Sequence, residues 1–591
     1  MKTYGKQLKA GCQLLWHQLF ILLLYAASID LFNELIAIPI LKGLTTFILQ
    51  KAEIPFVNYE NLLTIIVTKP WVIGALILEL LGILLLVYLQ FAVFLWLIDD
   101  LRNGHSYKKL PRQVISSLQT WTWSAIPLFA LYFIAIFPAA SAFFQTPLLA
   151  KVRIPQFVID FMVKKPLFCT ILIISYLAIS YLANRLALTL PLTILKGETI
   201  KAAMRTSWQQ TSGKTWLKLL GKLLLLLLIS SLVLLIAICA VVILQGVIDR
   251  GQAPFPFIAA NCLLLFLQGC SLIASLFTSI AALLILLELV DSQPLNKQKQ
   301  SLSPLGRMVF SVMAALVLLA TITGNLVYLS QLDTKMPLIV SHRGVSDQNG
   351  VQNTLPALIK TCKLHPDYVE MDIHETKDGK FVVMHDENLK QLANVNKRPR
   401  DLTLRQLTSL TVSENGHRAK IPSFDEYLKT ANKLHQKLLV EYKATRYDSP
   451  DAVKVFEQKY GANLLRHHHL VQSLNYRVVS DLKMLNPKLS VYYIQPYNFT
   501  YPQSLANGFS MEYSTMINDY SFVASAHQAG QKVFTWDMND EDSIRQMLYL
   551  DVDGLITDNV KLAQSTAKDF VRTNSYANKI LNYASILPLN E

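Results

Sequence analysis

The stretch that decides the fold and the chemistry of this chain is Leu338–Asp386, which reads LIVSHRGVSDQNGVQNTLPALIKTCKLHPDYVEMDIHETKDGKFVVMHD. It opens on an apolar, β-type run that ends abruptly in a His-Arg-Gly turn at 342–344. A short helical pattern follows, then a strand pattern at 368–374 and another at 381–384 that runs into His-Asp. Short strands separated by helices are typical of parallel β/α architecture.

Alternation along the second strand groups its charged side chains. Successive side chains of a strand point to opposite faces, so Glu370, Asp372 and His374 share one face. Two carboxylates on one face offer hard oxygen ligands to a divalent cation. His342 and His385 each follow the end of a strand, and imidazoles exchange protons near neutral pH. The stretch therefore predicts a metal-assisted active site. Surface acids and structural histidines are the less favoured alternative, because these residues lie in or directly after apolar strands.

The same pattern of short strands and helices continues to the end of the chain. Further strands are expected at 438–442, 469–474, 490–495, 509–513, 532–536 and 552–556. With 337–341 and 368–374 they make eight, if 381–384 is a hairpin-like extension of the second strand. The pattern predicts an α/β domain, a (β/α)8 TIM barrel over residues 337–591, with a small insertion at about 387–422. An open doubly wound sheet is the alternative, which no glycine-rich dinucleotide loop supports.

The ordered set of an HRG turn, an Asn-Thr helix start, an E-x-D strand and an HD strand end resembles the glycerophosphodiester phosphodiesterase family over about residues 336–562. The resemblance implies a barrel enzyme that hydrolyses glycerophosphodiesters to glycerol 3-phosphate and an alcohol, with Ca²⁺ or Mg²⁺ as cofactor. It implies His342 and His385 as the acid/base pair, with their individual roles open. It also implies Glu370, Asp372 and Glu441, the Glu of an E-x-K strand, as ligands of the cation.

Three further residues are expected to bind substrate. Arg343 and Lys443 are placed to offset the phosphate charge, Arg with two parallel hydrogen bonds and Lys as a point charge. Trp536 matches a late W-x-x-N segment of the family and is either an apolar wall for glycerol or barrel packing. One departure is Gln352, which stands where the family usually has Glu and leaves one acid fewer near the cation. The attacking group, water or the glycerol 2-hydroxyl, stays open, and the resemblance favours the hydroxyl.

Residues 1–330 have a different composition from the rest. The whole chain is 52% hydrophobic and only 16% charged, and runs of Leu, Ile, Ala and Phe dominate its first half. Since a bilayer crossing needs about 20 mostly apolar residues, this half is predicted to be an all-α, multi-pass membrane domain. We expect about seven crossings, at 15–38, 71–98, 122–146, 167–195, 219–248, 256–290 and 308–330. Residues 331–336 form a short linker that keeps the barrel close to the membrane.

Charge sets the expected orientation. The N-terminus and the loops on its side hold 15 Lys and Arg residues, against 8 in the alternate loops, although loop 147–166 is itself basic. This excess places the N-terminus in the cytoplasm and, after an odd number of crossings, the barrel outside the cell membrane. The net charge of +14 is therefore no argument for nucleic acid. The expected partners are the lipid bilayer and a glycerophosphodiester or glycerol-phosphate substrate.

Other functions remain open at this point. Gln352 alone would suit a catalytically weak protein that binds or senses phosphoglycerol. The size of the membrane half, far more than an anchor needs, would suit a lipid-handling domain. An enzyme with such a domain would act on glycerol-phosphate polymers or on lysophospholipids.

Overall fold

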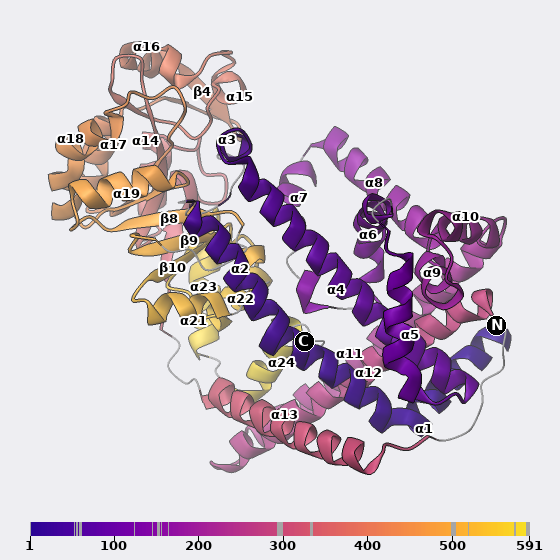
Figure 1. Cartoon of the computed structure of the whole chain (residues 1–591). Helices are drawn as coiled ribbons and strands as arrows, with labels where there is room; N and C mark the ends of the chain where they lie inside the picture. The colour runs from indigo at the N-terminus through magenta and orange to yellow at the C-terminus, as the bar shows by residue number, and fades with distance from the viewer. Residues whose placement is uncertain are drawn as a thin grey trace.

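The computed structural model describes residues 2–52, 54, 57, 62–122, 125–144, 146–149, 154, 156–163, 165–291, 300–330, 335–497, 504–517, 519, 521–572 and 575–586. Two halves are visible, a bundle of long helices and a compact α/β barrel (Figure 1). Most of the predicted linker, 331–334, lies outside the described residues.

Within the described part of the bundle, six helical segments are long and apolar enough to cross a membrane. They are Gln7–Lys51, Pro70–Asn103, Pro166–Lys196, Thr215–Ile248, Phe255–Val290 and Pro304–Ser330. The first comprises α1 (Lys2–Phe32), a π-helical turn at Asn33–Ala37 and α2 (Ile38–Lys51), and the third runs from α8 (Pro166–Arg185) into α9 (Thr189–Lys196). The others are α4 (Pro70–Asn103), α11 (Thr215–Ile248), α12 (Phe255–Val290) and α13 (Pro304–Ser330). The membrane half is thus helical and multi-pass, as predicted.

The expected crossing at 122–146 differs from the other six. It contains α6 (Ile126–Ala140), whose 15 residues span about 22 Å at ~1.5 Å per residue, less than the roughly 30 Å of a hydrocarbon core. A run of apolar residues predicts burial in lipid but does not say how much of it is one straight helix.

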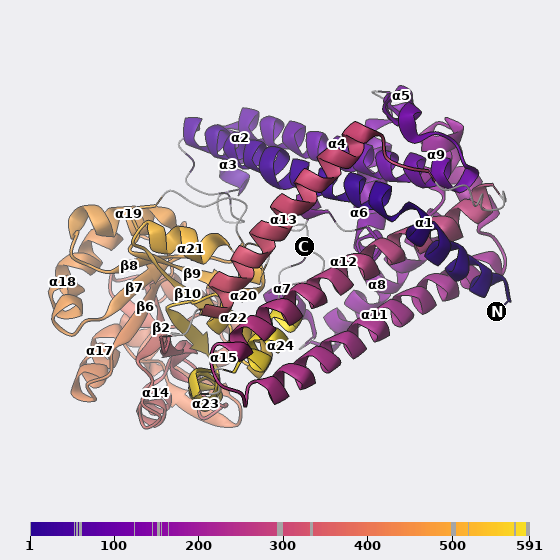
Figure 2. The same ribbon diagram turned by 90° about the horizontal axis from the view of Figure 1, so that it is seen from below.

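The chain nevertheless passes from one end of the bundle to the other in this segment. At one end Arg102 Nη1 donates to the carbonyl of Asp291 at 3.2 Å, and Gln7 reaches Glu288 on the same helix. At the other end Gln156 N donates to Ser514 Oγ of the barrel at 3.2 Å. Residues 103–156 therefore connect opposite ends, and the N-terminus lies at the end away from the barrel (Figures 1 and 2).

The bundle encloses a cavity of about 1200 Å³. Its walls are mainly aliphatic and aromatic, and they come from α1, α4, α6, α8, α11, α12 and α13. Polar groups interrupt them: Gln268 and Asn325 exchange hydrogen bonds of 3.0 and 2.9 Å, and Gln268 also donates to the Tyr583 hydroxyl at 2.8 Å. A cavity with such walls suits an amphiphile better than a polar solute.

Eight parallel strands close the barrel, as predicted. In order around it they are β1 (Leu338–Ser341), β2 (Tyr368–Glu375), β6 (Leu438–Tyr442), β7 (Leu470–Ser473), β8 (Val491–Gln495), β9 (Gly508–Glu512), β10 (Lys532–Trp536) and β11 (Gly554–Thr557). The pairing of β1 with both β2 and β11 completes the circle. β3 (Phe381–Val383) pairs antiparallel with β2 and lies outside the eight, as the expected hairpin-like extension.

Alternation along the strands creates two apolar layers. Side chains such as Met371, Val440 and Phe509 point outward and pack on the surrounding helices. A smaller set, including Leu439, Tyr492 and Phe534, fills the inside of the barrel. The helices of the outer layer are α14 (Leu355–Cys362), α17 (Phe424–Lys433), α18 (Ala452–Arg466), α19 (Tyr476–Leu485), α21 (Ser521–Gln528), α22 (Glu541–Tyr549) and α23 (Val560–Arg572).

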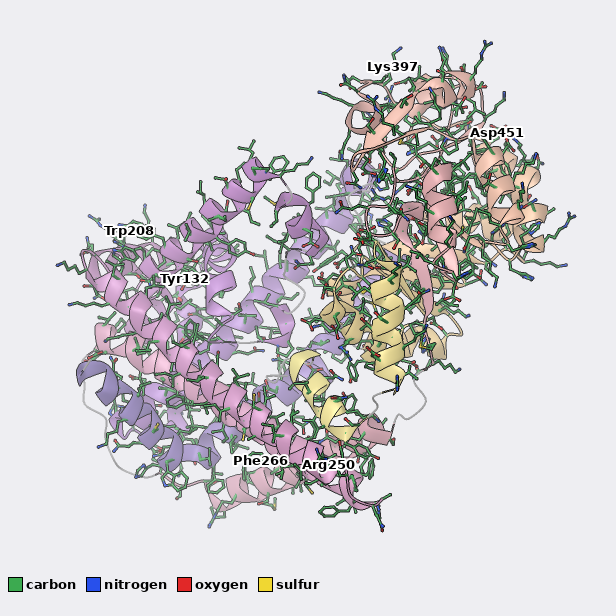
Figure 3. All side chains as sticks on the ribbon, turned by 180° about the vertical axis from the view of Figure 1, so that it is seen from behind. Tyr132, Trp208, Arg250, Phe266, Lys397 and Asp451 are labelled. Carbon is green, nitrogen blue, oxygen red and sulfur yellow. The ribbon has the colours of Figure 1, made fainter. Side chains whose placement is uncertain are left out.

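The insertion at 387–422 has more structure than its sequence suggests. It contains α15 (Lys390–Ala393), a 3-10 turn at Pro399–Asp401, α16 (Leu404–Ser409) and a hairpin of β4 (Thr411–Glu414) and β5 (His417–Lys420). Leu389, Leu407 and Val412 build a small core of its own with Val382 and Met384 of the preceding segment. Figure 3 shows Lys397 at the outer edge of the barrel domain.

The C-terminal helix α24 (Tyr576–Ile586) leaves the barrel and packs on α11 and α12. Ala577 N donates to Asp249 Oδ2 at 2.8 Å, and the Tyr328 hydroxyl at the end of α13 donates to the Lys579 carbonyl at 2.8 Å. Lys579 Nζ in turn donates to the Leu329 carbonyl at 2.7 Å. The barrel is thus held to the bundle by more than its linker.

Candidate active site

Three carboxylates meet at the carboxyl end of the barrel strands. Glu370 and Asp372 point inward from β2, and Glu441 points inward from the next strand, β6, where it pairs in register with Asp372. All three are buried, and one oxygen of each lies within 4.8 Å of the others. Alternation along β2 makes this possible, because it keeps its two acids on the inner face.

Cationic and amide groups surround these acids. Lys443 Nζ lies 3.2 Å from Asp372 Oδ1 and 2.5 Å from Glu441 Oε1. Arg343 N donates to Glu370 Oε2 at 2.7 Å. Asn353 Nδ2 donates to Asp372 Oδ2 at 2.8 Å, while Asp372 N donates back to Asn353 Oδ1 at 3.1 Å. Each acid therefore keeps a fixed orientation.

The protein does not fully offset three buried negative charges. Burial, followed by the charge of Asp372, raises the pKa of Glu370 to about 8. Burial also raises the pKa of Glu441, although Lys443 opposes it. Burial would raise the pKa of Asp372 as well, but Lys443, His385 and Arg343 outweigh it and hold that pKa below its usual range. A hard divalent cation would favour the ionised form of all three acids. Three convergent carboxylate oxygens are the ligands that Mg²⁺ and Ca²⁺ prefer. The donor set fits such an ion.

The turn after β1 brings the histidine and the arginine to these acids. Arg343 and Gly344 both adopt the left-handed backbone, with φ of 49° and 68°. A Cβ at 344 would lie 2.6 Å from the Tyr427 hydroxyl, so only glycine fits there. The tight turn expected at this glycine is present.

His342 lies between two carboxylates and a guanidinium. Its Nδ1 is 2.9 Å from Asp558 Oδ1 and 3.4 Å from Asp537 Oδ1, and Arg343 Nε donates to its Nε2 at 3.1 Å. Burial lowers the pKa of the ring, but Asp537 and Asp558 outweigh burial and raise it to about 9. The Arg343 contact needs Nε2 without a proton, so it favours the opposite state. The effect of two carboxylates on the His342 pKa exceeds that of one guanidinium on a rotatable side chain, so the protonated ring is favoured. Once Nε2 carries a proton it no longer accepts from Arg343 Nε, which would then turn away.

His385 has the opposite character. Its Nδ1 is 2.8 Å from Asp386 Oδ1, and because a carboxylate only accepts, Nδ1 carries the proton and Nε2 is left as a base. Burial lowers the pKa of the ring to about 4, with the charge of Lys443 adding to the effect and Asp372 opposing it. His374 supports this residue from β2, since its Nε2 donates to the His385 carbonyl at 3.1 Å.

Trp536 and Gln352 lie at the edges of this cluster. Trp536 Nε1 donates to the Ser510 carbonyl at 3.2 Å, and its ring packs against the apolar cluster inside the barrel. Gln352 contacts the arginine: its Oε1 accepts from Arg343 Nη1 at 2.9 Å.

Comparison with known proteins accounts for both halves of the chain. Residues 8–324 match the membrane domain of glycerophosphoryl diester phosphodiesterase, and residues 342–562 match the glycerophosphoryl diester phosphodiesterase family. The chain belongs to this family. It is a membrane-domain glycerophosphodiester phosphodiesterase, a phosphoric diester hydrolase, and the resemblance seen in its motifs is confirmed.

Relatives of this phosphodiesterase match its barrel. A glycerophosphodiester phosphodiesterase of Caldanaerobacter subterraneus subsp. tengcongensis is 25% identical over 230 residues, which cover 37% of this chain and 93% of the relative. A lysophospholipase D of Homo sapiens is 39% identical over 102 residues, 15% of this chain and 32% of the relative. A phosphodiesterase of Oleispira antarctica, solved in complex with sn-glycerol-3-phosphate, is 22% identical, covers 39% of this chain and 97% of its own, and has a TM-score of 0.34.

The structure brings together all the residues that sequence reasoning selected in the phosphodiesterase, and it adds several that were missed. Asp558 and Asp537 face His342, and Asn539 Nδ2 donates to Asp558 Oδ2 at 3.0 Å. Asp386 contacts the candidate catalytic residue His385, and Asn353 donates to the candidate metal ligand Asp372. The available signal was position, because Asp537 and Asp558 directly follow β10 and β11. Acids placed directly after inner strands of a barrel fall at its active mouth.

Proposed function

We propose that the enzyme cleaves glycerophosphodiesters by acid–base catalysis between His342 and His385, with a divalent cation held by Glu370, Asp372 and Glu441. The observation that carries this proposal is that the two imidazoles, with pKa values pushed to about 9 and about 4, share one barrel mouth with three buried carboxylates. Titratable groups driven apart in this way are the usual mark of an acid and a base.

The cation, when bound, would draw charge from a phosphoryl oxygen and so make the phosphorus more electrophilic. Arg343 Nη2 has no hydrogen-bond partner among the residues that the structure describes, which leaves it available to a second phosphate oxygen. Lys443 balances the acids and would shift towards the phosphate once a cation takes over that role. Trp536 would border the glycerol with its apolar ring.

Proton transfer follows from the two histidine environments. His385 Nε2, unprotonated at neutral pH, takes the proton of the attacking hydroxyl as the new P–O bond forms. His342, charged under the influence of Asp537 and Asp558, gives its proton to the oxygen of the departing alcohol as that P–O bond breaks. With the glycerol 2-hydroxyl as nucleophile, which the family resemblance favours, water then opens the cyclic phosphate to glycerol 3-phosphate.

We further propose that the barrel lies on the extracytoplasmic side of the cell membrane. The loops on the side of the N-terminus carry 15 Lys and Arg residues against 8 on the other side, which favours a cytoplasmic N-terminus. The barrel and the N-terminus lie at opposite ends of the bundle (Figure 2). Together these observations support an outward-facing active site close to lipid headgroups.

A substrate panel with the full chain in detergent micelles tests the function. We expect metal-dependent release of glycerol 3-phosphate from free glycerophosphodiesters, its loss on chelation, and its recovery when Mg²⁺ or Ca²⁺ is restored. Glu441→Gln should lose cation binding measured by calorimetry, because it removes one of three charged ligands. Undiminished turnover in chelator would exclude the role of the cation.

The bundle cavity favours a second candidate substrate within the same reaction. About 1200 Å³ of mainly apolar volume between membrane-spanning helices suits an acyl chain, so lysophospholipids belong in the panel beside free and polymeric glycerol phosphodiesters. A turnover preference for the lysophospholipid would favour this candidate. A catalytically weak protein that binds phosphoglycerol is the less favoured alternative, because Gln352 hydrogen-bonds Arg343.

A further inference from the structure

Gln352 lies between the arginine of the active site and an acid of the insertion. Its Oε1 accepts from Arg343 Nη1 at 2.9 Å. Its Nε2 donates to Glu414 Oε1 at 2.7 Å, and its backbone N donates to Glu414 Oε2 at 2.9 Å. Glu414 therefore uses both carboxylate oxygens on a single residue that itself contacts Arg343.

This arrangement determines which way the amide points. A carboxylate only accepts hydrogen bonds, so Glu414 must receive the NH2 group of Gln352, and the amide oxygen is left to face Arg343. The opposite orientation would set NH2 against guanidinium N–H. Charge-assisted bonds are the stronger kind, so Glu414 holds the amide in the orientation that Arg343 needs.

Glu414 is itself placed by the core of the insertion. It ends β4, whose Val412 is buried with Leu407 of α16 and with Val382 and Met384 of the segment that leads to His385. The hairpin turn that follows has the left-handed residues Asn415 and Gly416. The insertion is thus anchored on the barrel wall on one side and reaches the active site through Glu414 on the other.

We propose that Glu414, acting through Gln352, is a positioning residue that holds Arg343 ready for the substrate phosphate. The inference rests on the proposed role of Arg343 in phosphate binding. Gln352 fixes Nη1 of Arg343, and this bond does not depend on the charge of His342, whose protonation would release Nε; Nη2 is left as a free donor among the described residues. Fixing Nη1 limits the rotation of the guanidinium and so reduces the entropy that phosphate binding must overcome.

The pair also explains why glutamine suits position 352. A glutamate there would pair directly with Arg343, reduce its attraction for phosphate and repel Glu414 at close range. With Gln352 and Glu414, the negative charge lies on Glu414, one residue farther from Arg343 than a charge at position 352 would be. The hairpin stays attached, and Arg343 keeps more of its positive field.

The test is binding of inorganic phosphate to the full chain in nanodiscs, measured by calorimetry, together with KM and kcat for a glycerophosphodiester. Glu414→Ala should weaken phosphate binding and raise KM by about five- to tenfold, as expected for one lost charge-assisted bond, with little change in kcat. Glu414→Gln, which keeps the shape and one accepting oxygen, should show a smaller loss. Glu426→Ala removes an exposed carboxylate of α17 and is the matched control.

An exchange of the two groups separates positioning from mere support of the fold. Gln352→Glu should bind phosphate poorly, and adding Glu414→Gln should recover part of the affinity because the repulsion is removed. Wild-type affinity in Glu414→Ala, or no recovery in the exchanged pair, would overturn the inference. Arg343→Lys tests the underlying function separately, because unchanged phosphate binding in that variant would count against the proposed role of Arg343. If binding is weakened in Arg343→Lys but unchanged in Glu414→Ala, only the proposed role of Glu414 is refuted.

Discussion

At the scale of single residues, two chemically identical side chains acquire opposite pKa shifts from their neighbours. His342 contacts Asp558 and lies close to Asp537, whereas at His385 the carboxylates of Asp372 and Asp386 are opposed by the positive charges of Lys443 and Arg343. Burial lowers the pKa of both rings, so the difference comes from the count and sign of nearby charges.

The pH dependence of kcat/KM should reflect this difference. The proposed mechanism requires His385 without its proton and His342 with it, so activity should rise with pH as His385 deprotonates near 4 and fall again as His342 deprotonates near 9. Asp558→Asn removes one of the carboxylates that raise the His342 pKa, so the alkaline limb should move to lower pH while the acid limb stays. An alkaline limb that does not move in this variant would refute the assignment of His342 as the acid.

Residue chemistry was predictable only where a pattern repeated. Alternation along one apolar strand made Glu370 and Asp372 predictable, because its two faces can be told apart from the sequence, whereas Glu441 was predicted from the E-x-K strand of the family resemblance. Asp558 directly follows a short strand and Glu414 ends one, so neither is part of a repeating apolar pattern. Their roles depend on partners 216 and 62 residues away, which only the folded chain brings near.

At the scale of elements, the strands that carry the site are held from outside by an aromatic cluster. Phe456 of α18 meets Phe381 of β3 at 5.5 Å and Tyr442 of β6 at 5.4 Å between ring centroids, both edge to face. β3 leads to His385 and β6 carries Glu441. One helix therefore fixes the spacing between the candidate base and the candidate metal ligands.

Phe456→Ala should loosen both strands together. Removing a fully buried phenyl ring costs about 3–5 kcal/mol, and hydrogen exchange of the β3 and β6 amides in the full chain should become faster in parallel. Phe456→Leu should lose less, and Ile359→Ala, at a position 44% exposed on α14, should leave exchange unchanged. Faster exchange in only one of the strands would show that the cluster does not couple them.

Helices and strands were predictable where a regular hydrophobic pattern extends over enough residues. The eight barrel strands and the extension at 381–383 follow from apolar alternation, and the six long spans follow from unbroken hydrophobicity. The insertion at 387–422 was predicted, but its internal elements were not, since α15 and α16 are only four and six residues long and their core depends on Val382 and Met384 outside it. The 122–146 segment was predicted to be one crossing because hydrophobicity alone does not show where a helix ends within an apolar run.

At the scale of the whole molecule, the barrel is docked on the bundle at several points. Asp249 of the α11–α12 turn accepts from the start of α24, Tyr328 of α13 bonds to Lys579, and Gln156 of α7 (Gln156–Val163) bonds to Ser514 beyond β9. All these contacts lie at the end of the bundle away from the N-terminus. The position of the active site relative to the membrane is therefore determined by the bundle and not by a flexible tether.

This docking makes the membrane orientation testable with single cysteines, after replacement of the native ones. If the barrel is outside, Lys397→Cys at the exposed edge of the barrel (Figure 3) should react with a membrane-impermeant maleimide in intact cells. His105→Cys, at a 70% exposed side chain on the side of the N-terminus, should react only after lysis. The reverse pattern would place the active site in the cytoplasm, and because both ends of the bundle are fixed by direct contacts, it would mean that the basic loop 147–166, and not the larger total on the other side, governs how this chain inserts.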